Sequence, residues 1–535
     1  MRFLLIALSA VLTGLCFTFH QVGFLSILTV IPLLYAVLKE AEKDKKPFRF
    51  YGYGYMWGAI FYACVFYWFA YQYPLEYLGF TTGEAIAYVA LSWFGSGLLL
   101  SVVLALWIFF TGLFVRTRLC KKRPWLFIPF TSCLYVIIEY LFTLGPLATP
   151  WARLAVTQQS NISGIQTSSV FGSYFISFII ISVNAALAYG LYELTKNKNK
   201  KTALICLISA ASLFFGNMGA GGILYAADKA KTAAVDTYIT AAAYQSNNVS
   251  GRTKTGSVVE VMDDFLADAE EEINRSGADL IVMPEGCFSI DIKKYPSLEE
   301  KLLDFCKTHS VVIIFGCYEY ADDGFYNVTY CASHDGTLSG PYRKQHPVPF
   351  GEFTPVRDIL LKIMPFLEDV TDIGDELSAG TESVVFDSNI GKIGSFICFD
   401  SAFEQIGYEQ TAKGAVLLTE STNDSWWMDS AQLYEHNGHA VLRAVESRKF
   451  IVRSATAGYS TVISAEGEIL SGVTPLTKGF AVFTVTPRSD ISFYHKTPYL
   501  FPSLCLSVVC GGFIWAVIHK KRSVSKNIDG KDLQN

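Results

Sequence analysis

Eight apolar runs dominate this sequence, and each is long enough to form a helix that crosses a lipid bilayer. A bilayer core requires about 20 consecutive apolar residues per helix. The runs cover residues 3–19, 22–38, 52–72, 86–114, 125–145, 168–193, 202–224 and 498–519. The first run could be read as a cleaved signal peptide, but the second follows closely and no small-residue cleavage pattern precedes a polar domain. We therefore predict a multi-span α-helical membrane domain with about eight transmembrane helices.

The composition agrees with a membrane part and excludes several classes of function. Of the 535 residues, 51% are hydrophobic and 17% are charged, which is too apolar for an ordinary soluble enzyme. The net charge of -5 and the lack of a long basic run argue against nucleic-acid binding. The 12 cysteines form no CxxC pair and show no regular spacing, so neither a disulfide framework nor a zinc site is expected.

Basic residues fall in every second connection between the apolar runs. They occur at position 2 and within residues 39–46, 116–123, 196–201 and 520–522. Because Lys and Arg concentrate on the cytoplasmic side of a membrane, both chain ends are predicted to be cytoplasmic. The predicted organisation is an N-terminal transmembrane domain at 1–228, an extracytoplasmic domain at 229–492, a transmembrane helix at 493–520 and a cytoplasmic tail at 521–535.

The segment between the seventh and eighth runs has the composition of a soluble domain. Short β-rich stretches occur at 237–244, 280–283, 311–315, 392–397 and 450–453, and helical patterns lie between them at 258–276 and 298–309. Strands that alternate with helices over about 250 residues are typical of layered α/β domains. An α/β fold is therefore expected outside the membrane.

Three predicted strands of this domain end in residues whose side chains could react together. One ends in a carboxylate at Glu285, one in a cation at Lys344 and one in a thiol at Cys398. A carboxylate beside a thiol can act as its general base, because cysteine attacks as the thiolate. A nearby lysine would stabilise the oxyanion that forms when a carbonyl is attacked. Taken singly, Glu285 could be a helix-start carboxylate, Lys344 a surface charge and Cys398 a buried core thiol.

Short segments around these residues are distinctive in their order and spacing. They are Pro284-Glu285, Tyr342-Arg-Lys344 with Pro349-Phe-Gly-Glu352, Ile397-Cys398-Phe-Asp400, Thr422-Asn-Asp-Ser-Trp426, Arg443-Ala-Val-Glu-Ser-Arg448 and Arg453-Ser-Ala-Thr-Ala-Gly458. Together they resemble the nitrilase superfamily, and nearly the whole chain is similar to the apolipoprotein N-acyltransferase family within it. The resemblance implies an α-β-β-α sandwich with Glu285 as general base, Lys344 as oxyanion-stabilising cation, Cys398 as acylated nucleophile and Glu352 as a supporting second glutamate.

The chain departs from the family pattern beside the nucleophile. Phe399 and Asp400 stand where the family usually has tyrosine and glutamate, so a hydroxyl is missing and the acidic arm is one methylene shorter. Substrate contacts are expected at these two residues and at Asn423, Trp426 and Trp427. Two apolar stretches, 365–367 and 426–428, are candidate lids that exclude water from the site.

Two histidines stand out because they lie three positions apart. His436 and His439 have no carboxylate-rich context, so no metal is expected and they are interpreted as helix-surface or substrate-loop residues. The sequence also lacks a P-loop or a dinucleotide fingerprint, and no cofactor is expected.

The family resemblance implies an acyltransferase of a bacterial inner membrane. Its acyl donor would be a membrane phospholipid, its acceptor the α-amino group of a diacylglyceryl-cysteine at a lipoprotein N-terminus, and its expected state a monomer. Two alternatives remain open at this stage. One is a membrane-tethered amidohydrolase that transfers the acyl group to water, and the other is an inactive relative that only binds lipid or lipoprotein.

Overall fold

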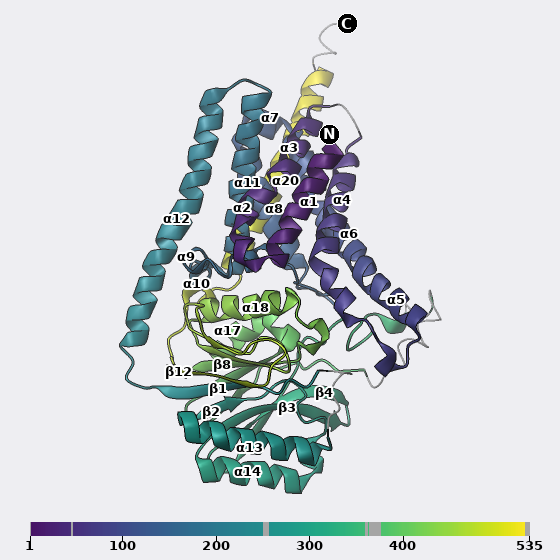
Figure 1. Cartoon of the computed structure of the whole chain (residues 1–535). Coiled ribbons are helices and arrows are strands. Elements are labelled where there is room, and N and C mark those ends of the chain that lie inside the picture. The colour runs from purple at the N-terminus through teal and green to yellow at the C-terminus, as the bar shows by residue number, and fades with distance from the viewer. Residues whose placement is uncertain (1, 44–45, 250–255, 359–361, 363–375, 530–535) are drawn as a thin grey trace.

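The computed structural model has a bundle of apolar helices joined to a layered α/β domain (Figure 1). It describes residues 2–43, 46–249, 256–358, 362 and 376–529. The chain builds the bundle first, then the α/β domain, and returns to the bundle with its last helix. Both marked chain ends lie at the end of the bundle far from the α/β domain.

The bundle consists of long apolar helices linked by short turns. The main helices are α1 (Arg2–Thr18), α3 (Ile31–Ala41), α4 (Arg49–Val65), α5 (Thr82–Ala90), α6 (Ser96–Val115), α8 (Phe127–Leu141), α11 (Ser173–Thr195), α12 (Lys200–Ala233) and α20 (Leu500–Asp529). The short ones are α2 (Ser26–Thr29), α7 (Arg118–Lys122), α9 (Ile162–Ile165) and α10 (Ser168–Phe171). Within the described residues, six helical segments are long and apolar enough to cross a membrane. Because α1 and α4 have only 17 residues each, the count of eight spans stays a prediction.

Several helices differ in extent from the apolar runs. The run 168–193 is split because Gly172 has a positive φ of 77°, and a side chain there would meet the ring of Tyr494 at 2.5 Å. The helix α12 continues past the expected end at 224 to Ala233, and α20 continues past 520 to Asp529. An apolar run covers only the part of a helix that faces lipid. It therefore underestimates the length of a helix that extends beyond the membrane.

The α/β domain contains two six-stranded sheets. One has the order β12-β1-β2-β3-β4-β5 and the other β11-β10-β9-β8-β7-β6. In the first sheet the strands are β1 (Ile239–Gln245), β2 (Leu280–Val282), β3 (Val312–Ala321), β4 (Gly324–Ala332), β5 (Leu338–Arg343) and β12 (Gly479–Val485). In the second they are β6 (Val385–Phe386), β7 (Ile393–Ile397), β8 (Leu417–Thr422), β9 (Ile451–Ala455), β10 (Thr461–Ile463) and β11 (Ile469–Gly472). The strands β1, β2 and β3 pair in parallel, as do β7, β8 and β9.

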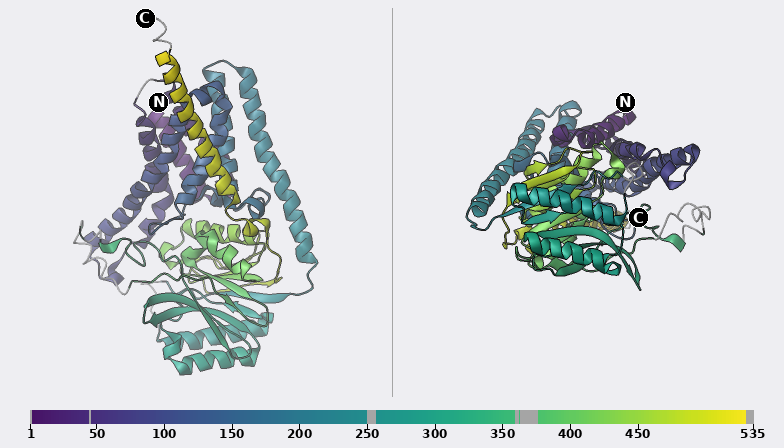
Figure 2. Two further views of the ribbon diagram at one scale, coloured as in Figure 1. Left: turned by 180° about the vertical axis from the view of Figure 1, so that it is seen from behind. Right: turned by 60° about the horizontal axis from the view of Figure 1, so that its bottom comes forward.

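Helices cover the outer face of each sheet. The helices α13 (Val258–Ser276) and α14 (Pro296–His309) lie on the side far from the bundle, and α17 (Glu404–Ala412) and α18 (Gln432–Ser447) lie between the second sheet and the bundle (Figure 1). The views in Figure 2 show the same layers from behind and from below. The predicted α-β-β-α arrangement is therefore confirmed, and one of its helix layers faces the membrane helices.

Buried ion pairs join this helix layer to the bundle. Arg153, from the connection between α8 and α11, lies 3.1 Å from Glu404 of α17, and Arg443 of α18 lies 3.4 Å from the same carboxylate. Burial alone would raise the pKa of Glu404, but the two guanidinium groups outweigh burial and lower it to about 2. The α/β domain is thus anchored on the bundle by ion pairs that form only when both parts are in contact.

The Arg153→Met variant tests this anchor. Because it leaves Arg443 as the one guanidinium partner of Glu404 in a buried site, we expect a loss of about 3 kcal/mol in the free energy of unfolding, measured as a lower melting temperature in detergent micelles. A lowered pKa stabilises the fold above the unfolded value of about 4.3 and loses this effect as pH falls toward the folded value. The difference between variant and wild type should therefore shrink below about pH 4. Lys293→Met, which removes a half-exposed pair with Glu299, is the control and should change little.

Candidate active site

Cys398 stands at a sharp turn where β7 ends. Its φ is 51°, in the left-handed region that residues with a side chain rarely adopt. The turn is stabilised by Asp400, whose carboxylate accepts hydrogen bonds from the backbone N–H of Ile397 at 3.3 Å and from the hydroxyl of Tyr342 at 2.8 Å. These bonds hold a strained conformation at the residue predicted to be the nucleophile.

Lys344 lies between two carboxylates. Its Nζ is 2.9 Å from Oε1 of Glu285 and 2.7 Å from Oε1 of Glu352. Glu352 is held in turn by the backbone N–H of Val348, which donates to its Oε2 at 2.7 Å. Lys344 is 1% exposed, and Glu285 and Cys398 are each 8% exposed, so bulk water is largely excluded from these groups.

Neighbouring strands fix the position of Glu285. The side-chain amide of Asn327 on β4 donates to Oε1 at 2.7 Å, and the backbone N–H of Asn423 donates to Oε2 at 2.8 Å. The turn that carries Glu285 presses against Gly316 of β3, where a Cβ would lie 2.6 Å from the nitrogen of Gly286. Only glycine permits this close approach, and the carboxylate is therefore held rigidly by backbone and side chain alike.

The electrostatics of the cluster leave Cys398 protonated at rest. Burial raises the pKa of its thiol well above the ordinary value, and the charge of Glu285 raises it further, which the opposing effect of Lys344 does not offset. Although burial disfavours the charged lysine, Glu285 and Glu352 raise the pKa of Lys344 well above its usual range. Burial also raises the pKa of Glu352. The site thus combines a thiol, a permanent cation and a base, rather than a preformed thiolate.

The pH dependence of alkylation tests this protonation state. Because the raised pKa keeps the thiol form dominant, we expect the rate of reaction of Cys398 with iodoacetamide to rise with pH through about pH 9 without a plateau. The rate is followed by intact mass, with Cys398→Ala as the background control for the other cysteines. A plateau below about pH 7 would instead indicate a stable thiolate.

The residues predicted to contact substrate occupy different environments. Phe399 packs against Trp151 of the bundle with ring centroids 5.3 Å apart, and Trp427 lies between Trp151 and Trp68 at 6.1 and 5.8 Å. Trp426 is 37% exposed. These aromatic groups line the junction between the two parts of the molecule, and the Trp426–Met428 lid candidate lies there. The other lid candidate, 365–367, falls outside the described residues.

Asp400 and Asn423 form hydrogen bonds within the protein. Asp400 is fully buried, and its carboxylate also accepts the backbone N–H of His346 at 2.9 Å. The side-chain oxygen of Asn423 accepts the hydroxyl of Ser425 at 2.7 Å, while its backbone supports Glu285. Both residues therefore shape the loops around the site. The shorter acidic arm of Asp400 is long enough because its partners lie close to the turn.

The two histidines of α18 correct the interpretation made from the sequence. His436 and His439 are both fully buried and lie neither on a helix surface nor in a loop. The error arises because α18 is covered on one side by the second sheet and on the other by the bundle. Its polar face is therefore buried, although a polar helix face normally indicates exposure to solvent. No group of His, Cys, Asp and Glu suited to a metal ion occurs in the part of the chain that the structure describes.

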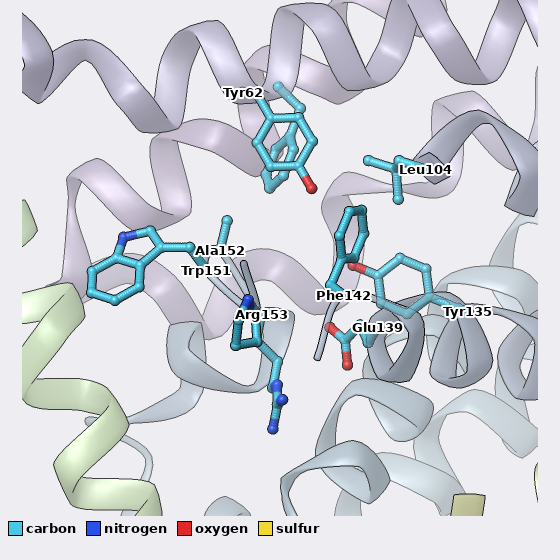
Figure 3. Close-up of a pocket in the computed structure, with 10 residues that line it drawn as sticks. Tyr62, Leu104, Tyr135, Glu139, Phe142, Trp151, Ala152 and Arg153 are labelled. Carbon is cyan, nitrogen blue, oxygen red and sulfur yellow. The ribbon is translucent and has the colours of Figure 1, made fainter. Parts of the chain in front are cut away.

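The connection between α8 and α11 brings bundle residues to the site, which sequence reasoning missed. Trp151 packs on Phe399, and the backbone N–H of Ala152 donates to Glu435 of α18 at 3.1 Å. Figure 3 shows Trp151, Ala152 and Arg153 around a pocket that Tyr62 and Glu139 of the bundle also line. No local pattern could have assigned these residues to the site, because their partners lie about 250 positions away.

Comparisons with known proteins cover both parts of the chain. A family model for the apolipoprotein N-acyltransferase N-terminal domain matches residues 9–186, and one for carbon-nitrogen hydrolases matches residues 240–493. The apolipoprotein N-acyltransferase of Geobacter metallireducens is 27% identical over 546 residues, covering 98% of this chain and 96% of that protein. That of Gloeobacter violaceus is 27% identical over 446 residues, covering 83% and 80%.

Among solved structures, Saccharomyces cerevisiae Nit3, a member of the nitrilase superfamily, aligns with a TM-score of 0.38 and 18% identity, covering 50% of this chain and 96% of that one. The two family models follow one another along the chain in the same order as the helical bundle and the α/β domain, and the relatives match most of its length. The chain therefore belongs to the apolipoprotein N-acyltransferase family.

Proposed function

We propose that this membrane acyltransferase moves an acyl chain from a phospholipid, through a thioester on Cys398, to the α-amino group of a lipoprotein's N-terminal diacylglyceryl-cysteine. The observation that carries the proposal is the buried cluster in which Lys344 contacts both Glu285 and Glu352 beside the strained turn of Cys398. A base, a cation and a nucleophile in one dry site are the groups that acyl transfer requires.

In the first half of the reaction, Glu285 removes the proton from Cys398 Sγ as the sulfur attacks the ester carbonyl of the phospholipid. The resulting oxyanion lies against Nζ of Lys344 and the backbone N–H of Phe399. When the intermediate collapses, the ester C–O bond breaks and Glu285 returns its proton to the departing oxygen. The products are an acyl thioester and a lysophospholipid.

In the second half, the neutral α-amino group of the acceptor attacks the thioester. A reference pKa of about 8 leaves a useful neutral fraction of this amine near neutral pH. As the C–S bond breaks, Glu285 accepts a proton from the amine and passes it to the leaving sulfur. The amide forms and the thiol of Cys398 is restored, so no cofactor and no metal is consumed.

The charges and the chain ends support a proposal for the location of the reaction. Basic residues mark one side of the bundle, and the α/β domain lies at the end opposite both chain ends (Figure 1). We infer an inner-membrane protein with eight spans, cytoplasmic termini and a catalytic domain at 229–492 on the extracytoplasmic side, working as a monomer.

Acyl transfer in proteoliposomes tests the proposal. We expect a diacylglyceryl-cysteine peptide to gain the mass of one acyl chain in the presence of phospholipid, while the same peptide with an acetylated N-terminus stays unchanged. Double-reciprocal plots of initial rate against phospholipid concentration, at several fixed acceptor concentrations, should give parallel lines, as a ping-pong mechanism requires. Intersecting lines, or release of free acid from small amides without peptide acylation, would contradict it and favour an amidohydrolase.

A further inference from the structure

His436 lies directly beneath the nucleophile turn. It projects from α18 and is fully buried, and its Nε2 is 3.1 Å from the backbone carbonyl oxygen of Cys398. The hydroxyl of Ser401 donates to the same oxygen at 3.0 Å. The carbonyl of the predicted nucleophile therefore has two partners, one for each of its lone pairs.

The direction of this hydrogen bond is fixed by chemistry. Besides the carbonyl of Cys398, Nε2 of His436 faces Oγ of Ser401 at 3.3 Å and Oε1 of Glu420 at 3.4 Å. The hydroxyl hydrogen of Ser401 is directed to the carbonyl, so all three oxygens accept and Nε2 of His436 must carry the proton. The other ring nitrogen, Nδ1, lies 2.9 Å from Oδ1 of Asp424 and 2.9 Å from a guanidinium nitrogen of Arg453. It can donate to the first or accept from the second, and Nε2 remains the donor to Cys398 in either case.

Buried groups hold the imidazole in this orientation. Arg453 also pairs with Asp424 at 2.9 Å and with Glu420 at 3.2 Å, and all three of these side chains are fully buried. The rings of Trp151 and Trp427 lie 5.3 and 5.2 Å from the imidazole and confine it on the side of the bundle. His436 is thus a fixed donor rather than a mobile side chain.

The bond controls a group on the opposite side of the peptide unit. The carbonyl of Cys398 and the N–H of Phe399 belong to one planar trans peptide, so they point in opposite directions. With the carbonyl held inward toward α18, the N–H of Phe399 is directed outward, toward the carbonyl of a bound ester. Rotation of this peptide would remove the backbone donor from the oxyanion and leave Lys344 as its partner.

We propose that His436 is a positioning residue that sets the oxyanion-binding N–H of Phe399 by anchoring the carbonyl of Cys398. The inference rests on the proposed function in one respect, namely that Cys398 is the nucleophile. It adds a role for α18, a helix that supplies no group to the Glu-Lys-Cys cluster itself.

Two reactions of Cys398 separate this role from a general effect on folding. Acylation by p-nitrophenyl butyrate forms an oxyanion, whereas alkylation by iodoacetamide does not. For His436→Leu in the full-length protein, we expect the burst of p-nitrophenolate to slow by on the order of 100-fold, as for loss of one oxyanion donor, while the alkylation rate is unchanged. His436→Gln, which keeps an N–H at similar reach, should recover most of the burst rate.

His439→Leu is the matched control. His439 lies one turn along the same helix, is equally buried, and has no hydrogen-bond partner for either ring nitrogen among the described residues. It should leave both reactions unchanged. Equal slowing of acylation and alkylation in His436→Leu, or an unchanged burst, would overturn the proposal. The ester probe replaces the phospholipid, so the burst tests the role of His436 even if phospholipid is not the donor. A wild-type burst without transfer from phospholipid would count only against phospholipid as the acyl donor.

Discussion

Replacing Glu285 with glutamine should slow acylation of Cys398 by on the order of 10²- to 10⁴-fold, the usual contribution of a general base. Burial and the charge of Glu285 itself keep the thiol of Cys398 protonated at rest, so the proton must be removed during attack. Glutamine keeps the size of the side chain and can still accept from Asn423, but it cannot take a proton. The rate of adduct formation with phospholipid, followed by intact mass, measures the effect.

The pH profile separates loss of the base from loss of structure. Without the base, the rate at which Cys398 is acylated in Glu285→Gln should depend on hydroxide and rise with pH. The wild-type rate should not show this dependence near neutrality. Glu299→Gln, on the outer helix α14 and partly exposed beside Lys293, is the control and should behave as wild type. A Glu285→Gln rate within about threefold of wild type would assign the base to another residue.

Replacing Lys344 with methionine should damage both catalysis and stability. The cation that stabilises the oxyanion is lost, which slows acylation by on the order of 10²- to 10³-fold. Two carboxylates, Glu285 and Glu352, are left close together without a positive partner, which lowers the free energy of unfolding by about 3 to 5 kcal/mol. Thermal unfolding in micelles and the adduct rate measure the two effects separately.

The stability change of Lys344→Met has a definite dependence on pH. Burial already raises the pKa of Glu352 in the wild type, and loss of the opposing attraction of Lys344 raises it further. Ionisation of Glu352 then destabilises the folded variant, and its deficit in the free energy of unfolding relative to wild type should shrink as pH falls from about 8 to about 5. Lys392→Met, which removes a half-exposed lysine beside Asp387, is the control. A difference in the free energy of unfolding that stays constant between these pH values would show that Glu285 and Glu352 are not left as an unpaired couple in the variant.

The cluster could be predicted from the sequence because each member follows a strand of a recognisable pattern. Glu285, Lys344 and Cys398 follow β2, β5 and β7, and residues just after strands meet at the edges of stacked sheets. The alternation of strands and helices predicts a layered α/β domain, and the family resemblance implies the α-β-β-α order of its layers. These features are local in the sequence, and local features are what a sequence pattern reports.

The contacts between the two parts of the molecule could not be predicted in this way. Trp151 on Phe399 and Arg153 on Glu404 join positions about 250 residues apart, and no periodicity connects them. For the same reason α18 was expected to carry exposed histidines, although its polar side chains, His436 among them, are enclosed by the sheet and the bundle. The sequence of α18 has an apolar face and a polar face, and a sequence interpretation assigns the polar face to solvent, but both faces are buried.

Intact-mass analysis of the purified protein after incubation with phospholipid alone tests the central claim most directly. Wild type should gain one fatty-acyl group that hydroxylamine removes and that a diacylglyceryl-cysteine peptide discharges, and Cys398→Ala should gain none. An adduct of equal amount on Cys398→Ala, or no adduct on wild type under conditions where phospholipid binds, would contradict the thioester route.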